Sequence, residues 1–226
     1  MVVRCSLVLA IIFLGCSSQK EEKLPTQSTR VSQMPTGNAV AGSVLFATCK
    51  TCHGETGGGN KSMNAPALVN SNDWYLYRQL MNFKKGVRGY LPEDTLGIQM
   101  AAFAKTLNDS IAVSDVVAHI KTLPEVSLPV IVKGDVGKGQ RLYQSICGSC
   151  HGPEGKGNEK MNAPRLNGLD DWYIKRQIAN YKKSIRGGHV ADKLGAQMVS
   201  MVASLSEEQV KDVIAYIRST TQSTAR

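Results

Sequence analysis

The chain has 226 residues, 42% of them hydrophobic, which is enough for one medium-sized domain or two small ones. Its formal net charge of +9 at pH 7 suggests an anionic partner, such as an acidic protein, a membrane surface or nucleic acid. Nucleic acid is disfavoured, because the charge is spread along the chain and the sequence shows neither a recognition helix nor a single-strand stacking platform.

Residues 1–16 are predicted to form an export signal. Arg4 precedes an apolar run, residues 7–14, that is too short to span a bilayer. The following Gly15 and Cys16 resemble a bacterial lipoprotein processing site. We therefore expect a periplasmic, membrane-anchored protein with a lipid on Cys16; ordinary cleavage and an uncleaved anchor are the alternatives. Residues 17–36 are polar without an apolar period, which predicts a flexible tether.

An internal repeat follows the tether. Residues 49–89 align without a gap with residues 147–187, and the similarity continues, after a one-residue shift, into DVVAHIKTL and DVIAYIRST. The sequence therefore predicts two copies of one domain, residues 37–123 and 127–222, joined by a short connection that contains Pro129. A domain of about 85 residues has little core of its own, so each copy is expected to need added support.

Both copies are predicted to be helical, which gives an all-α fold. Apolar residues of the middle segments recur at helical spacing, at Leu76, Leu80, Phe83 and Val87 and again at Ile174, Ile178, Tyr181 and Ile185. We expect Asp170 to cap the second of these helices and Gly187 to end it. Residues 206–209, SEEQ, form a capping-box pattern at the start of the last helix.

The pentapeptide CxxCH occurs at residues 49–53 and 147–151. Two thiols on one helical turn can add to the vinyl groups of haem, and the histidine that follows can bind its iron. The pattern predicts two covalently attached haem c groups, held by Cys49, Cys52 and His53 and by Cys147, Cys150 and His151. A thioredoxin-like disulfide is disfavoured because no strand precedes either pair. A zinc site is disfavoured because the pairs start 98 positions apart, at 49 and 147.

The folded part of the chain resembles the dihaem class I cytochromes c of the cytochrome c4 type, which consist of two fused domains. The resemblance rests on CxxCH, on a glycine and an aromatic residue before it, on an APxL segment after it, and on a methionine shortly before the last helix. It implies that Met100 and Met198 are the sixth iron ligands. It also implies that the carbonyls of Pro66 and Pro164 accept the other N–H of the proximal histidines.

Other side chains could take the sixth position. The rivals are Met201, whose counterpart is Phe103; Met63 and Met161, which recur but lie close to the proximal side; and His189, whose counterpart is Leu91. His119 corresponds to Tyr216 and is expected to pack. Arg78 and Arg176 are candidates for binding haem propionates, and Trp74 and Trp172 for the core. The basic clusters FKKGVRG and YKKSIRG are predicted to be exposed helix ends that could form a docking patch.

An iron atom with two strong protein ligands has no open position for a substrate. The predicted function is therefore electron transfer between respiratory redox proteins outside the cytoplasm, with partners that have acidic docking surfaces or belong to a membrane oxidase. A tethered subunit of an oxidase or reductase complex is the alternative. An enzyme with a thiolate-ligated haem is disfavoured, because the only spare cysteines, Cys5 and Cys16, lie in the predicted signal.

Overall fold

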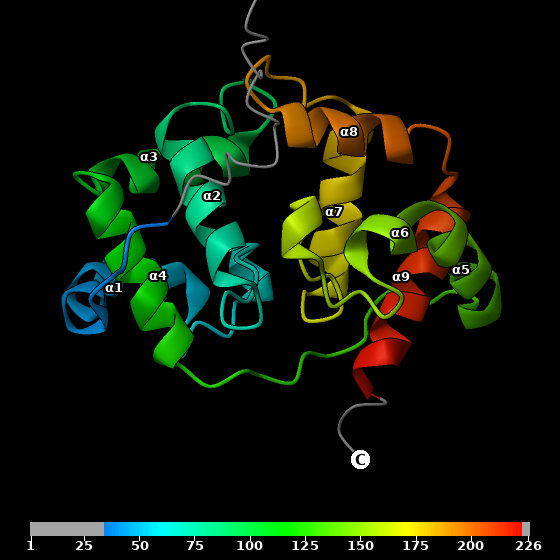
Figure 1. Ribbon diagram of the computed structural model, residues 1–226, viewed down its shortest axis with the longest axis horizontal. Helices are drawn as coiled ribbons and strands as arrows, with labels where there is room; N and C mark the ends of the chain where they lie inside the picture. Colours follow the sequence, from blue (N-terminus) through cyan, green and yellow to red (C-terminus); the bar gives the residue numbers. More distant parts are fainter. Residues whose placement is uncertain (1–33, 223–226) are drawn as a thin grey trace, which may run out of the picture. The chain divides into compact units, whose positions relative to one another are not determined.

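The computed structural model describes residues 34–222 (Figure 1). The predicted export signal and residues 17–33 of the predicted tether lie outside this range. The described residues are helical and contain no strand beyond one isolated bridge in each repeat, which confirms the predicted all-α fold class. No helix between residues 34 and 222 is both long and apolar enough to cross a membrane.

Each repeat begins and ends with helices that cross, and it carries a middle pair between them. The first repeat contains α1 (Ala39–His53), the short 3-10 helix η2 (Lys61–Met63), α2 (Asp73–Lys84), α3 (Thr95–Thr106) and α4 (Ser110–Thr122). The second contains α5 (Val136–Leu142), η3 (Tyr143–Cys147), α6 (Gly148–His151), η4 (Glu159–Met161), α7 (Asp171–Lys182), α8 (Lys193–Val202) and α9 (Glu207–Gln222).

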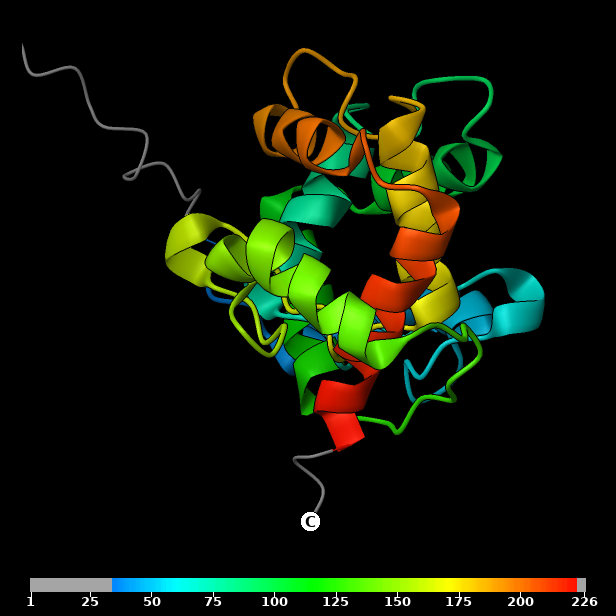
Figure 2. The same cartoon turned by 90° about the vertical axis from the view of Figure 1, so that its right-hand side faces the viewer.

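Glycine makes the crossing of the outer helices possible. A Cβ on Gly42 would lie 1.8 Å from the carbonyl oxygen of Asp115, and a Cβ on Gly139 would lie 1.9 Å from that of Asp212. Only a residue without a side chain fits at these points, so α1 can contact α4 closely and α5 can contact α9 closely. Figure 2 shows the crossing of α5 and α9 from the front. This explains the glycine that precedes both cysteine pairs.

Aromatic residues fill the space beside these crossings. Phe46 is 2% exposed and its ring lies 5.2 Å from that of His119, and Tyr143 and Tyr216 form the equivalent pair at 5.2 Å. The expected packing role of His119 is therefore confirmed. Phe46 and Tyr143 each belong to the hydrophobic cluster of their own repeat.

The repeats differ by one residue in their first helix. Three positions separate Phe46 from Cys49, whereas four separate Tyr143 from Cys147. The additional residue lies in η3, a π-helix, and such single π-turns accommodate insertions within a helix. The second repeat is one residue shorter between α8 and α9, where Ser206 caps α9, and this restores the register of the two crossing helices.

Local helix signals were predicted with mixed success. The capping box of α9 is confirmed: Gln209 N donates to Ser206 Oγ at 3.1 Å, and Ser206 N donates to Gln209 Oε1 at 2.8 Å. The predicted end of α7 at Gly187 is wrong. The helix ends at Lys182 because Ser184, with φ of 55°, adopts the left-handed conformation. Val87 and Ile185 therefore lie beyond the middle helices.

Asp170 precedes α7 as predicted, but its side chain does not cap the helix. Instead, it accepts hydrogen bonds from Ala67 N of the first repeat, at 2.8 Å, and from Trp172 Nε1, at 3.1 Å. The equivalent bond in the other direction is donated by Arg165 N of the second repeat to Asn72 Oδ1 of the first, at 2.7 Å. A residue at a helix N-terminus in each repeat thus binds the backbone of the other repeat.

The connection between the repeats is held at both ends. Asn70 exchanges two hydrogen bonds with the backbone of Val126, at 2.9 and 3.0 Å. The fully buried Asp171 accepts from the backbone N–H groups of Ile131, at 2.5 Å, and Val132, at 2.8 Å. These bonds satisfy backbone groups that a loop would otherwise leave to solvent, so they restrain the connection.

We expect Asp171→Ala to destabilise the second repeat and release the connection. The change removes the charged acceptor of two part-buried backbone N–H groups, and hydrogen bonds to charged groups contribute about 1.5–3 kcal/mol each. Denaturant unfolding of the holoprotein and limited proteolysis between residues 124 and 135 measure both effects. Asp73→Ala is the matched control, because Asp73 occupies the same position of the first repeat and accepts from Trp74 N within its own helix. Equal effects of the two changes would contradict this role.

Candidate haem sites

Each repeat encloses a cavity lined by its predicted cofactor-binding side chains. The first cavity has a volume of about 310 Å³ and the second of about 160 Å³. The lining includes Cys49, His53 and Met100 in the first repeat and Cys147, Cys150, His151 and Met198 in the second. Cys52 is the one predicted residue that is not part of the lining. The fold therefore brings residues from both ends of each repeat around one space.

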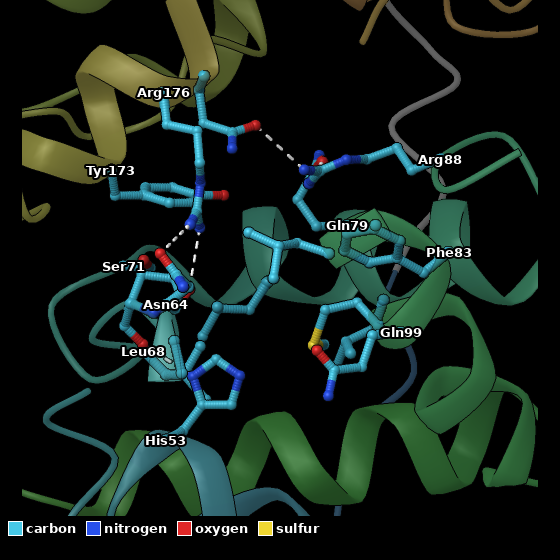
Figure 3. Close-up of a pocket in the computed structure, with 18 of the residues that line it drawn as sticks. His53, Asn64, Leu68, Ser71, Gln79, Phe83, Arg88, Gln99, Tyr173 and Arg176 are labelled. Atoms are coloured by element: carbon cyan, nitrogen blue, oxygen red, sulfur yellow. Dashed lines mark hydrogen bonds between the residues drawn. The ribbon is translucent and has the colours of Figure 1, made fainter. Parts of the chain in front are cut away.

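The histidines of the CxxCH motifs end α1 and α6 and are 6% exposed. His53 Nδ1 lies 2.8 Å from the carbonyl oxygen of Pro66, and His151 Nδ1 lies 2.8 Å from that of Pro164, as the family resemblance implied. Because a carbonyl only accepts, Nδ1 carries the proton and Nε2 keeps its lone pair. Burial lowers the pKa of both rings, which favours the neutral form that binds metals. Figure 3 shows the His53 ring pointing into the cavity.

The four cysteines of the motifs are free thiols. Burial raises the pKa of Cys49, and it raises that of Cys147 to about 11. As thiols, Cys49 and Cys147 are therefore neutral at physiological pH, and none of the four cysteines forms a disulfide within the described residues. Unpaired thiols beside a cavity with a neutral imidazole match the donor set for thioether attachment of a haem.

Met100 and Met198 lie on helices whose two ends are held by other side chains. Asp94 caps α3 by accepting from Gly97 N at 3.0 Å, and Asp192 caps α8 through Gly195 N at 2.9 Å. The following carbonyls, of Leu107 and Leu205, accept from the ammonium groups of Lys84 and Lys182. Both methionine positions are thus fixed in the same way in the two repeats.

The rival ligands fall into two groups. Met63, Met161 and Met201 also line the cavities, but they are 45%, 51% and 44% exposed, whereas Met100 and Met198 are partly buried. His189 does not line either cavity described here. Its ring packs on Tyr90 at 5.1 Å, and its Nδ1 accepts from Ala191 N at 3.1 Å. A second site with two histidine ligands therefore has no support.

Two guanidinium groups are buried between the cavities. Arg88 and Arg186 are each 6% exposed. Gln79 Oε1 accepts from Arg88 at 2.8 Å and from Arg186 at 3.0 Å, and Gln177 Oε1 accepts from Arg186 at 2.8 Å and from Arg88 at 3.1 Å. Tyr75 Oη accepts from Arg186 at 2.8 Å. Gln79, Gln177 and Tyr75 line both cavities, so this cluster forms part of the wall between them.

The positive charge of this cluster has no ion-pair partner within residues 34–222. Its hydrogen-bond partners are the neutral oxygens of Gln79, Gln177 and Tyr75, and the Nε atoms of Arg88 and Arg186 have no hydrogen-bond partner among the described residues. Burial would raise the pKa of Tyr75, but the two arginines lower it, which shows how positive the site is. Unpaired buried charges are costly, so a nearby anionic group would stabilise this cluster. The carboxylates of haem propionates have the required charge, so the cavities fit this group.

The basic clusters, predicted to be mostly exposed helix ends, contain both exposed and buried cations. Lys85 and Lys183 are exposed, but Arg88 and Arg186 are not. The signal that could have identified these arginines is a glutamine nine positions earlier, present in both repeats.

The predicted propionate candidates Arg78 and Arg176 reach across the domain boundary. Arg78 donates to the carbonyl of Asn162, and Arg176 to that of Asn64, both at 3.0 Å. Arg176 consequently lines the cavity of the first repeat, as Figure 3 shows. Arg78 lines that of the second. Each arginine side chain thus forms part of the cavity wall of the other repeat.

Comparisons with known proteins agree with this geometry. The family model described as Cytochrome c matches residues 39–124 and 136–221. Cytochrome c4 of Azotobacter vinelandii is 27% identical over 195 residues, which cover 80% of this chain and 89% of that protein. Subunit CcoP of the cbb3-type cytochrome c oxidase of Rhodobacter capsulatus is 30% identical over 222 residues, 92% of this chain and 72% of the subunit.

A solved structure supports the same assignment. The reduced recombinant cytochrome c4 from Pseudomonas stutzeri has a TM-score of 0.63 and 25% identity, and the alignment covers 81% of this chain and 98% of that one. The family match falls on both repeats, and each repeat has a cavity that carries a CxxCH motif. The chain therefore belongs to the cytochrome c family, as a dihaem protein of the cytochrome c4 type with two covalently attached haem c groups.

Proposed function

We propose that this dihaem cytochrome carries electrons, one at each iron, between respiratory redox proteins in the periplasm and has no catalytic site of its own. Bound haem c supplies reversible one-electron exchange between ferric and ferrous iron. The observation that carries the proposal is the pairing, in each cavity, of a buried neutral histidine with a methionine from a helix fixed at both ends. Such a pair leaves no iron position for a substrate.

The proposed roles of the ligands follow from their chemistry. His53 and His151 bind iron through Nε2, because their Nδ1 protons are donated to Pro66 and Pro164. Met100 and Met198, which line the same cavities, would each supply a thioether sulfur as the second protein ligand. Thioether sulfur is a soft ligand that favours ferrous iron, so it raises the reduction potential relative to a second histidine. Cys49, Cys52, Cys147 and Cys150 hold the porphyrins by thioether bonds.

Arg88 and Arg186 are proposed to bind the propionates. Their guanidinium groups lie between the two cavities and lack anionic partners among residues 34–222. Paired with carboxylates, they would neutralise the negative charge of both cofactors at the boundary of the repeats. This role would couple haem attachment to the docking of the two domains.

Attachment to a larger complex is the second candidate. The similarity to subunit CcoP of a cbb3-type oxidase favours it, since that protein is part of a membrane complex. A lipid on Cys16, which lies outside the described residues, would hold either a free carrier or a subunit at the membrane. Mass spectrometry of the mature N-terminus tests the lipid, and co-purification with an oxidase separates the two roles.

The proposed carrier function predicts that neither haem binds an added ligand quickly. Because protein ligands fill both axial positions, the visible spectrum of the reduced protein should not change on exposure to carbon monoxide. A redox titration followed by visible spectroscopy should show two one-electron steps. Rapid binding of carbon monoxide at one haem would reveal a labile position and favour an enzyme.

Met100→His and Met198→His should each lower the potential of one haem, because imidazole favours ferric iron more than thioether does. The shift falls within the range of about 0.8 V that axial ligands cover. Each variant should also lose the weak sulfur-to-iron absorption of that haem at the red end of the spectrum. Met63→His and Met161→His are the matched controls and should change neither quantity. If a control variant loses this absorption instead, the sulfur ligand is reassigned.

Arg88→Met should lower the potential of at least one haem, because loss of a buried positive charge stabilises the ferric state. The expected size is on the order of 1 kcal/mol, or about 40 mV for one electron. Lys85→Met removes the same charge from the exposed neighbour and should shift the potential much less, because water screens it. Equal shifts for the two variants would place the Arg88 guanidinium away from the cofactors.

A further inference from the structure

The second repeat has a solvent-facing hollow of about 620 Å³. Its lining comes from the connection and from helices α7 and α9. Trp172, Lys175 and Ala179 of α7 line only this hollow, whereas Arg176 also lines the first haem cavity. Apolar and cationic side chains line the hollow: Ile131, Val132, Trp172 and Ala179, with Lys133, Lys175, Arg176 and Lys211. The hollow is therefore apolar and positively charged at once.

Core side chains occupy the same region of the first repeat. Tyr77 is buried in the hydrophobic cluster there, and Met34 and Met81 pack against it. The aligned positions of the second repeat are Lys175, Ile131 and Ala179. A large aromatic ring and a long thioether are thus replaced by a solvated ammonium and a methyl group. The substitutions open the second repeat at a place where the first repeat is filled.

The cations around the hollow are only partly compensated. Lys211 forms an ion pair with Glu208 at 3.2 Å, and Arg176 is bonded to Asn64. Lys133 and Lys175 are exposed and form no ion pair or side-chain hydrogen bond within residues 34–222. The nearby Asp171 is buried and already accepts from the backbone of the connection. Two ammonium groups therefore remain available to an anionic partner.

The charge of the two repeats is also unequal. Residues 136–221 carry 13 Lys and Arg against 8 Asp and Glu, a net charge of +5, whereas residues 39–124 carry 8 against 6, a net charge of +2. An acidic protein would be steered toward the second repeat. The net charge and the hollow thus both favour the second repeat as the place where an acidic protein binds.

A single layer of α7 side chains separates the hollow from the haem cavities. Trp172 lines the hollow, and its ring centroid lies 6.2 Å from that of Tyr173, which lines both cavities. The Arg176 guanidinium stacks on both rings, at 5.0 and 5.4 Å. A protein bound at the hollow would therefore be close to both cofactors.

We propose that this hollow is the docking site for an acidic redox protein, whose carboxylates pair with Lys133 and Lys175 while an apolar side chain contacts Trp172. The proposal rests on the proposed electron-carrier function and names the surface that its partner uses. A protein is favoured over a membrane because the hollow combines a few cations with apolar lining at the scale of one or two side chains.

The test uses the holoprotein and flavodoxin, a small acidic one-electron protein, as probe. Calorimetry at low salt measures its dissociation constant. Lys133→Glu combined with Lys175→Glu should weaken binding by roughly tenfold or more, because both attractive charges are reversed. Lys160→Glu combined with Lys193→Glu is the matched control: it alters the net charge equally at exposed sites elsewhere on the second repeat. An equal or larger effect of the control pair overturns the proposal.

A second variant tests shape as well as charge. Lys175→Tyr combined with Ala179→Met restores the residues of the first repeat, and it should abolish flavodoxin binding by filling the hollow. Sedimentation with phosphatidylglycerol vesicles is the alternative arm. A Lys133 and Lys175 variant that loses vesicle binding but keeps flavodoxin binding would assign the surface to membranes and overturn the proposal.

The redox titration separates failure of this site from failure of the proposed function. If the wild-type protein shows two reversible one-electron steps but does not bind flavodoxin, the docking site is wrong and the carrier function stands. If the haems do not titrate reversibly, the carrier function itself fails. Unchanged haem content and visible spectra in every variant would establish that the substitutions leave the cofactor sites intact.

Discussion

Two buried positive charges, which have no counter-ion among residues 34–222, lie at the boundary between the two repeats. Arg88 and Arg186 share the oxygens of Gln79 and Gln177, so each arginine is bonded to both repeats. The amide oxygens accept hydrogen bonds from the guanidinium N–H groups but do not neutralise their positive charge. Because the dielectric constant of the interior is low, the uncompensated charge is costly. The proposed pairing with haem propionates would supply the missing negative charge at this boundary. Haem attachment and the association of the two repeats would then be parts of one folding problem.

The repeats are related in sequence but not equivalent. Reciprocal bonds from Arg78 and Arg176 preserve the relation at the boundary, whereas the π-helix η3 and the shorter link before α9 break it within the second repeat. These two changes compensate each other in the crossing of α5 and α9. Tyr77 and Lys175 occupy aligned positions, and the difference between them has another effect. The first repeat has a buried aromatic ring there, whereas the second has an exposed ammonium group. The asymmetry therefore lies mainly in the surface, while the cofactor cavities keep the same chemistry.

Sequence alone predicted what depends on local patterns. The CxxCH spacing, the helical stripes and the capping box at Ser206 are each contained within a few turns, and the repeat provides a second copy of each pattern. The misses depend on contacts between distant segments. Asp170 is of a residue type that commonly caps helices, but its carboxylate accepts a hydrogen bond from Ala67 N, 103 positions away. The buried guanidinium of Arg88 donates to Gln177 of the other repeat. No local pattern distinguishes these residues from a solvated carboxylate or guanidinium.

The shared wall between the cavities has a consequence for how the two sites behave. Tyr75, Gln79, Tyr173 and Gln177 line both cavities, so no side chain in this group belongs to one site alone. A change of charge in either cavity acts on the same arginines, and it reaches the other cavity through hydrogen bonds rather than through solvent. Electrostatic interactions within such a dry cluster are screened less than those at the surface. Through this shared cluster, charge on one cofactor would act on the other, so the first electron to arrive would alter the field that the second one meets.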